Sequence, residues 1–217
     1  ENNELDVLCF SFKELSPDGK MVKKGEGGGT GVMTGVDFVH SYGCDRLGGL
    51  CAVWRCLFRK GFLDENNIYS PEINMGEDVP YSFKSLFLAK KVMFLDNMGY
   101  VYRQNSSSLT GSKKVLSPEV LYEKCFENTR LIVDVMRYIP SYDMEILEAC
   151  KNVAKYTFMM WKENFQRMDD ENRKGFLKIC RRCFGKDRSM IKKVVSSKEY
   201  FRYLFWLTIG VYCFDGR

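Results

Sequence analysis

An acidic pair in a distinctive setting is the best candidate for chemistry in this chain. Glu77 and Asp78 lie in the stretch Gly76–Tyr81, directly before Val79–Leu88, whose apolar residues recur at helical intervals. A carboxylate within hydrogen-bond reach of a hydroxyl can act as a general base. Asp78 can instead cap the helix, with Pro80 in its first turn. Both roles can hold together, because a helix N-terminus stabilises an ionised carboxylate.

Other residues that often do chemistry lack the partners they need. The nine cysteines are odd in number and lie mostly in apolar contexts, which favours a reduced chain. Cys180 and Cys183 have C-x-x-C spacing, but no second pair or neighbouring His completes a metal site, so we expect structural thiols on a helix. His40 is the single histidine, which argues against catalytic triads and histidine metal clusters. The glycine-rich stretch Gly25–Gly35 lacks the endings of phosphate-binding loops and is predicted to be a flexible loop.

A β-rich first half must position the acidic pair. Leu5–Phe12 is an apolar, strand-like run, and the turn signal Ser16–Gly19 pairs it with Met21–Lys23 in a predicted hairpin. Further strands are predicted at Leu50–Phe58, Lys91–Leu95 and Tyr100–Arg103, and a short helix at Val36–Tyr42.

The second half reads as helical from Ser117–Pro118 onward, with breaks near Pro140, Gly175 and Gly185. Asp169–Glu171 is predicted to be a surface turn. The chain is therefore expected to be α/β, as a mixed α+β arrangement with two regions, residues 1–112 and a helical region over 113–217.

Charge is unevenly distributed. The 33 Lys and Arg exceed the 28 Asp and Glu by five, and this excess lies entirely after residue 115. The stretch 162–202 is basic and rich in aromatic residues, which is typical either of a helix that approaches an anionic membrane surface or of a solvated helix face. No run is long and apolar enough to span a bilayer, and the acidic start is unlike a secretory signal. We therefore expect a cytoplasmic protein, at the inner face of the cytoplasmic membrane if the basic stretch docks there.

Five pieces in this order resemble a known family. Trp54–Leu63, Glu77-Asp78, Ala89–Val92, Tyr100–Arg103 and Ser106–Thr110 together are similar to the latter part of a family 2 glycosyltransferase of GT-A fold. The members most resembled are bacterial enzymes that build capsule, exopolysaccharide or lipopolysaccharide. The resemblance implies an inverting transfer of sugar from a nucleotide-sugar donor to a saccharide or lipid-linked acceptor.

The resemblance also implies roles for particular residues. Asp78 would be the general base, and Glu77, Trp54 and Arg55 would lie near the acceptor. At Trp54 a place in the protein core is an equal alternative. The donor diphosphate would be contacted by Arg103 and Ser108.

Some parts of the family pattern are missing from this sequence. Neither the parallel nucleotide-binding unit nor the D-x-D motif that holds a divalent metal, Mg or Mn, occurs here. We therefore expect a fragment that binds no metal and does not transfer sugar by itself. A sheet that lacks its first strands would expose an edge around Leu8, Phe10 and Phe12, so a homo-oligomer is expected.

Two functions from other classes remain open. The chain can be a non-enzymatic module whose basic tail docks on a membrane surface or a protein, with the acidic pair as a helix cap. Nucleic-acid binding ranks third, because the positive charge favours it but no nucleic-acid motif is present. We therefore expect no nucleic-acid partner.

Overall fold

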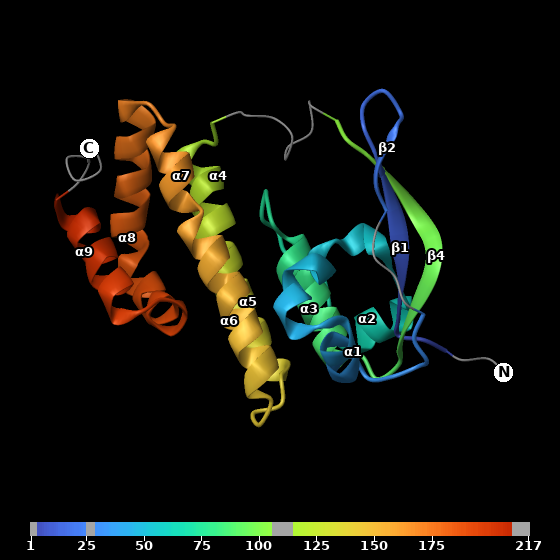
Figure 1. Cartoon of the computed structure of the whole chain (residues 1–217). Coiled ribbons are helices and arrows are strands. Elements are labelled where there is room, and N and C mark those ends of the chain that lie inside the picture. Colours follow the sequence, from blue (N-terminus) through green and yellow to red (C-terminus); the bar gives the residue numbers. More distant parts are fainter. Residues whose placement is uncertain (1–3, 25–28, 106–114, 210–217) are drawn as a thin grey trace. The chain divides into compact units, whose positions relative to one another are not determined.

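The chain forms two compact units that combine a small sheet with many helices (Figure 1). The computed structural model describes residues 4–24, 29–105 and 115–209. The first unit contains residues 1–71, 78–114 and 138–141, and the second contains 72–77, 115–137 and 142–217. The mixed α/β class expected from the sequence is found. Whether residues 1–112 and 113–217 are separate domains stays a prediction.

Strand β1 (Val7–Leu15) is the centre of the four-stranded sheet in the first unit. Strand β4 (Val92–Arg103) runs parallel to it along its whole length. Strands β3 (Cys56–Phe58) and β2 (Met21–Lys24) pair antiparallel with its beginning and end. The predicted hairpin is confirmed, and the nearly continuous apolar run of β1 fits a strand with neighbours on both sides.

The expectation of an exposed strand edge on β1 is wrong. Leu8 has partners in both β3 and β4, Phe10 is buried, and the Phe12 ring packs edge-on against Trp54 at 4.9 Å between centroids. The strands that cover β1 come from later in this same chain. The reason for expecting self-association through that edge is therefore removed, because β1 is already paired on both sides. The oligomeric state stays a prediction.

The buried carboxylate of Asp6 ties together the segments that enter the sheet. Its Oδ2 accepts hydrogen bonds from the backbone N–H groups of Lys90 (2.9 Å) and Lys91 (3.1 Å), just before β4. Its Oδ1 accepts from Arg59 at 2.9 Å, just after β3. Burial by itself raises the pKa of Asp6, but Arg59 and the two amides outweigh burial and lower it below its ordinary value of 3.8.

Helices cover the sheet in the first unit. The main ones are α1 (Gly35–Tyr42), α2 (Lys60–Glu65) and α3 (Asp78–Leu88), with the 3₁₀ helices η1 (Cys44–Cys51) and η2 (Val53–Arg55) between α1 and β3. The backbone of α1 touches α3 so closely that a Cβ on Gly35 would lie 1.7 Å from the Leu86 carbonyl oxygen. The helices predicted near 36–42 and 79–88 are confirmed.

Two predicted strands need correction. Leu50–Phe58 is strand only over its last three residues, because the apolar side chains before them pack from helical turns. A short apolar run has no period that separates these two structures. The strands predicted at 91–95 and 100–103 are one strand, β4, whose pairing shifts twice opposite Ser11 and so absorbs the residues between them.

The second unit is a helical assembly, as the sequence predicts. Its elements are α4 (Pro118–Tyr122), the π-helical turn η3 (Glu123–Glu127), α5 (Asn128–Val135), the 3₁₀ turn η4 (Met136–Tyr138, whose last residue belongs to the first unit), α6 (Met144–Met159), α7 (Trp161–Gln166), α8 (Asp170–Val194) and α9 (Ser197–Ile209). The predicted start is confirmed, because the Ser117 hydroxyl accepts a hydrogen bond from the Val120 N–H and caps α4. Aromatic rings fill the core, with Trp161 and Trp206 4.3 Å apart between centroids.

The breaks predicted at Gly175 and Gly185 are wrong. Helix α8 runs through both, because its buried residues, among them Phe176 and Ile191, outweigh the roughly 1 kcal/mol by which each glycine disfavours a helix. Asp169, predicted in a surface turn, caps this helix by accepting the Asn172 N–H at 2.8 Å.

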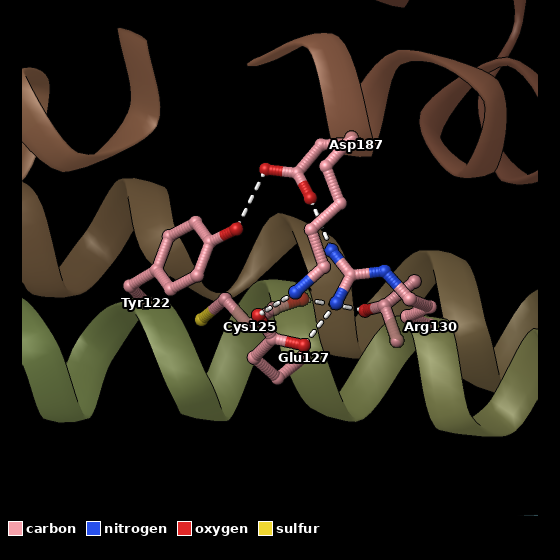
Figure 2. A network of polar contacts seen from close by, with 7 residues as sticks. Tyr122, Cys125, Glu127, Arg130 and Asp187 are labelled. Atoms are coloured by element: carbon pink, nitrogen blue, oxygen red, sulfur yellow. Dashed lines mark hydrogen bonds and ion pairs between the residues drawn. The ribbon is translucent and has the colours of Figure 1, made fainter. Parts of the chain in front are cut away.

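A buried polar network joins α8 to the α4–α5 segment (Figure 2). Asp187 is fully buried and accepts a hydrogen bond from the Tyr122 hydroxyl at 2.9 Å. The Arg130 guanidinium makes an ion pair with Asp187 and a second one with Glu127. Burial raises the pKa of Asp187, while Tyr122 and Arg130 oppose that rise. None of these pairings was predicted from the sequence.

Within the described residues, no helix has both the length and the apolar character that a bilayer span requires.

Replacing Asp6 with Asn tests the junction at the sheet. We expect unfolding at lower urea concentration than in the parent chain, because the ion pair with Arg59 is lost and the amide cannot accept every hydrogen bond as well. The lowered pKa adds a pH signature. Asp6 stabilises the parent above the unfolded pKa of 3.8, and this contribution disappears as pH falls through the lowered value. The gap between parent and variant should therefore close in acid. Asp64→Asn, in an exposed pair with Lys60, is the control, and equal losses in both variants would contradict the account.

Replacing Arg130 with Met tests the buried network. The variant should lose about 3–5 kcal/mol of unfolding free energy, because Asp187 is left buried without its cation. Adding Asp187→Leu should recover part of this loss, since it removes the stranded charge. Lys186→Met, which breaks only an exposed pair with Glu127, should change stability by about 1 kcal/mol or less. Equal effects of Arg130→Met and Lys186→Met in urea titrations would count against the network.

Candidate functional site

Asp78 is the first residue of helix α3 and is half-buried. The helix begins there because Pro80 fits its first turn and is buried, while Phe83, Leu86 and Phe87 pack inward. The positive end of the helix dipole stabilises the ionised carboxylate. The helix starts at Asp78 as expected, while capping by its side chain, which the sequence left open beside the catalytic role, stays a prediction.

Gly76 shapes the loop before the acidic pair. Its φ of +90° is strained for residues with a side chain, and an added Cβ would lie 2.2 Å from Nδ2 of Asn128 in α5. Residues 72–77 belong to the helical second unit, whereas Asp78 begins the part of the first unit that follows. Glu77 is half-buried at the end of this loop. Only glycine fits this backbone conformation and this close contact, so Gly76 fixes the path of the chain that leads into Glu77 and Asp78.

The end of η1 packs against α3 beside Asp78. The Ser82 hydroxyl, on the second turn of α3, donates a hydrogen bond to the Cys51 carbonyl at 3.1 Å. Burial raises the pKa of the Cys51 thiol to about 12, and the nearby charge of Asp78 adds to that rise. Cys51 is thus close to Asp78, and no sequence signal indicated this.

Trp54 forms an aromatic platform with β4. Its indole stacks on Tyr100 at 4.8 Å and on Tyr102 at 5.3 Å between ring centroids. Alternation along β4 places both tyrosines on one face, while Val101 on the other face is 54% exposed. Trp54 is half-buried and Tyr100 is 39% exposed, so the platform has an accessible side.

Arg55 lies in the interior rather than at the surface. Its guanidinium donates to the Gly49 carbonyl at 2.9 Å and to the Tyr42 hydroxyl at 3.4 Å, and it lies 5.0 Å from the centre of the Phe12 ring. Only 8% of the residue is exposed. These contacts hold η1 against the sheet, so its contact with an acceptor stays a prediction that this geometry does not favour.

Of the two predicted donor-side residues, the structure describes one. Arg103 ends β4, opposite Leu15, and is exposed. Ser108 lies outside the described residues. The structure therefore brings Asp78, Cys51 and the η2 segment carrying Trp54 together around α3, and it leaves the predicted diphosphate contacts as predictions.

The other side chains with reactive groups lie on helices, and their structural role stays a prediction. Cys180 is buried in α8 and Cys183 is half-buried one turn later. His40 lies in the last turn of α1. In the part of each unit that the structure describes, no three His, Cys, Asp or Glu side chains meet closely enough to hold a metal ion. Whether a divalent metal binds in a longer enzyme stays a prediction.

Asp78 and the Trp54 platform together suit a reaction at a hydroxyl group. A fixed carboxylate can accept a proton from a hydroxyl, and an aromatic surface can hold the apolar face of a sugar ring.

Comparison with known proteins found a glycosyltransferase. The chain is 27% identical over 112 residues to the uncharacterized glycosyltransferase EpsJ of Bacillus subtilis (strain 168), a match that covers 51% of this chain and 33% of that protein. The chain thus spans about a third of this curated relative. Among solved structures, S. aureus TarS 1–349 in complex with UDP-GlcNAc aligns at 15% identity with a TM-score of 0.48, covering 88% of this chain and 50% of that one. No protein family profile matches.

The thiol of Cys51 reports on the charge of Asp78. In Asp78→Asn the pKa of Cys51 should fall from about 12 toward its ordinary value of 9.0 and stay above it, because burial persists. The measurement is the rate of iodoacetamide labelling of Cys51 against pH, read by peptide mass spectrometry. Asp64→Asn, which removes an exposed carboxylate of α2, should leave the profile unchanged. An unchanged profile in Asp78→Asn would place its charge away from η1.

Proposed function

We propose that this chain is the acceptor-side part of an inverting glycosyltransferase of GT-A type, with Asp78 as the general base. One observation carries the proposal. An acidic residue at a helix start is packed beside the segment that bears an aromatic platform, in a chain similar in sequence to a glycosyltransferase. The proposed donor is a nucleotide-sugar, and the acceptor is a saccharide or a lipid-linked saccharide in bacterial surface polysaccharide synthesis.

The proposed reaction is a direct displacement. The acceptor hydroxyl gives its proton to the Asp78 carboxylate as its oxygen forms a bond to the anomeric carbon. The bond from that carbon to the nucleoside diphosphate breaks on the opposite face, and the electron pair leaves with the diphosphate. A single base suffices, and the configuration at the anomeric carbon is inverted.

The surroundings of Asp78 suit a base. A helix N-terminus favours negative charge, and the packing of η1 on α3 limits how far the Asp78 carboxylate can move. A catalytic group gains most when its position is fixed before the substrate arrives. Glu77 is proposed to help orient the acceptor.

Trp54 is proposed to hold the acceptor sugar through its stack with Tyr100 and Tyr102. Sugar rings have apolar C–H faces that pack well on aromatic rings. Three rings on two elements form a broader and stiffer surface than one indole, and the acceptor is proposed to lie on this surface with its reacting hydroxyl at Asp78.

Other parts of the proposal concern a longer protein. Donor binding, its divalent metal and contacts by Arg103 and Ser108 with the diphosphate are proposed for the intact enzyme, as is a place at the inner face of the cytoplasmic membrane. The alternative is a non-enzymatic module that docks through its basic helical region, and the second unit offers a specific surface for that docking.

Asp78→Asn tests the proposed base in a longer protein that contains this chain. Release of nucleoside diphosphate from a panel of UDP-sugars, with Mg or Mn and mixed saccharide acceptors, should fall about 10²–10⁴-fold. The amide keeps the size of the side chain but accepts no proton. Asp78→Glu should recover part of the activity.

The matched control is Asp96→Asn, which changes a carboxylate of β4 that bonds Ser11 at 3.4 Å. It should retain near-parental turnover. Thermal melts of all variants show whether they fold. Parental turnover in a folded Asp78→Asn protein would overturn the proposed base.

A further inference from the structure

Helix α9 is apolar on two opposite sides. Its inner side buries Tyr203, Trp206 and Leu207 in the core of the second unit. Its outer side exposes two phenylalanines one turn apart, Phe201 at 68% and Phe205 at 57%. Exposed aromatic residues at i and i+4 form a stripe, and the described residues place nothing over it. Packing of the core explains why the inner side of α9 is apolar. It does not explain the two exposed phenylalanines on the outer side.

The stripe borders a groove in the same unit. The groove has a volume of about 750 Å³ and lies between α9 and the junction of α6 and α7. Most of the residues that line the groove are aromatic, and they come from all three helices, including Phe158 of α6, Trp161 of α7 and Trp206 of α9. Its chemistry is therefore mainly apolar.

Cations surround this apolar surface. Lys162 lines the groove from α7, and Lys198 and Arg202 line it from α9, on the same side of the helix as the two phenylalanines. The carboxylate among the lining residues, Glu199, is already paired with Lys155 at 3.0 Å. Burial lowers the pKa of Lys162, the charge of Glu199 opposes that shift, and the charges of Arg202 and Lys155 add to it.

We propose that this basic aromatic face, formed by Lys162, Lys198, Phe201, Arg202 and Phe205, binds the surface of a bilayer that contains anionic phospholipid. The phenyl rings enter the boundary between head groups and acyl chains, and the three cations contact lipid phosphates. The exposed aromatic rings match the apolar boundary of the bilayer, and the three cations, which outnumber the single carboxylate Glu199 in the lining, match its anionic head groups.

A second copy of the chain fits this face less well. A symmetric dimer would place the same patch against itself, which brings three cations of each copy together. Facing like charges oppose association, whereas an anionic bilayer attracts them. The charge of the patch therefore selects the bilayer. This inference does not depend on the proposed sugar transfer.

The first experiment is flotation of the 217-residue chain with vesicles of phosphatidylcholine alone or with 30% phosphatidylglycerol (roughly the anionic content at which charge dominates binding). The parent should float with the anionic vesicles, and added salt should weaken the binding. Lys198→Gln/Arg202→Gln should lower the partition coefficient about twenty-five-fold, since each surface cation contributes about fivefold. Phe201→Ser/Phe205→Ser should lower it at least tenfold on both kinds of vesicle.

Matched controls separate the face from general properties of the chain. Lys174→Gln/Lys178→Gln removes two exposed cations of α8 that do not line the groove, and Tyr142→Ser/Met144→Ser removes two other exposed apolar side chains. Both should float like the parent. Circular dichroism and light scattering accompany each variant.

Three results would overturn the proposal. One is a parent chain that does not float with anionic vesicles. Another is equal loss in the test and control pairs, which would assign the binding to net charge. The third is a parental dimer that Phe201→Ser/Phe205→Ser makes monomeric without any change in flotation, which would assign the face to a second copy.

Discussion

The packing of η1 and η2 on helix α3 is the contact on which the candidate site depends. Ser82 holds the end of η1 through the Cys51 carbonyl, and this contact lies one turn from Asp78. The bare Cα of Gly35 lets α1 close on the far end of the same helix. With α3 held at both ends, a carboxylate at its start keeps one position relative to the Trp54 platform. A general base needs that precision more than it needs an unusual environment.

Local patterns in the sequence predicted the parts of the fold that depend on neighbours along the chain. The β1–β2 hairpin follows from an apolar run and the turn at Ser16–Gly19, and α3 follows from apolar spacing after Asp78. Ser117-Pro118 predicted the start of the helical region for the same reason. Asp78 was singled out as a base through the resemblance, because the local pattern by itself indicates only a helix cap. Its catalytic role stays a prediction.

Contacts between distant residues could not be predicted in this way. Tyr122 and Asp187 are 65 positions apart, and each looks like an ordinary surface residue until α8 closes over α4. Arg55 was expected at an acceptor, but an arginine beside a tryptophan looks the same in sequence whether it faces solvent or the Gly49 carbonyl. Gly175 predicted a break because propensity is local, whereas the packing that keeps α8 continuous is not.

The two units carry different candidate features: a carboxylate at a helix start, with the Trp54 platform, in the first, and a basic aromatic face in the second. Growth of a saccharide on a lipid at a membrane would use both. The central claim is a displacement assisted by the single base Asp78. It is tested most directly by the anomeric configuration of the product, read by NMR from a longer protein that contains this chain and an α-linked UDP-sugar. The account predicts a β-linked product, and an α-linked product would contradict it.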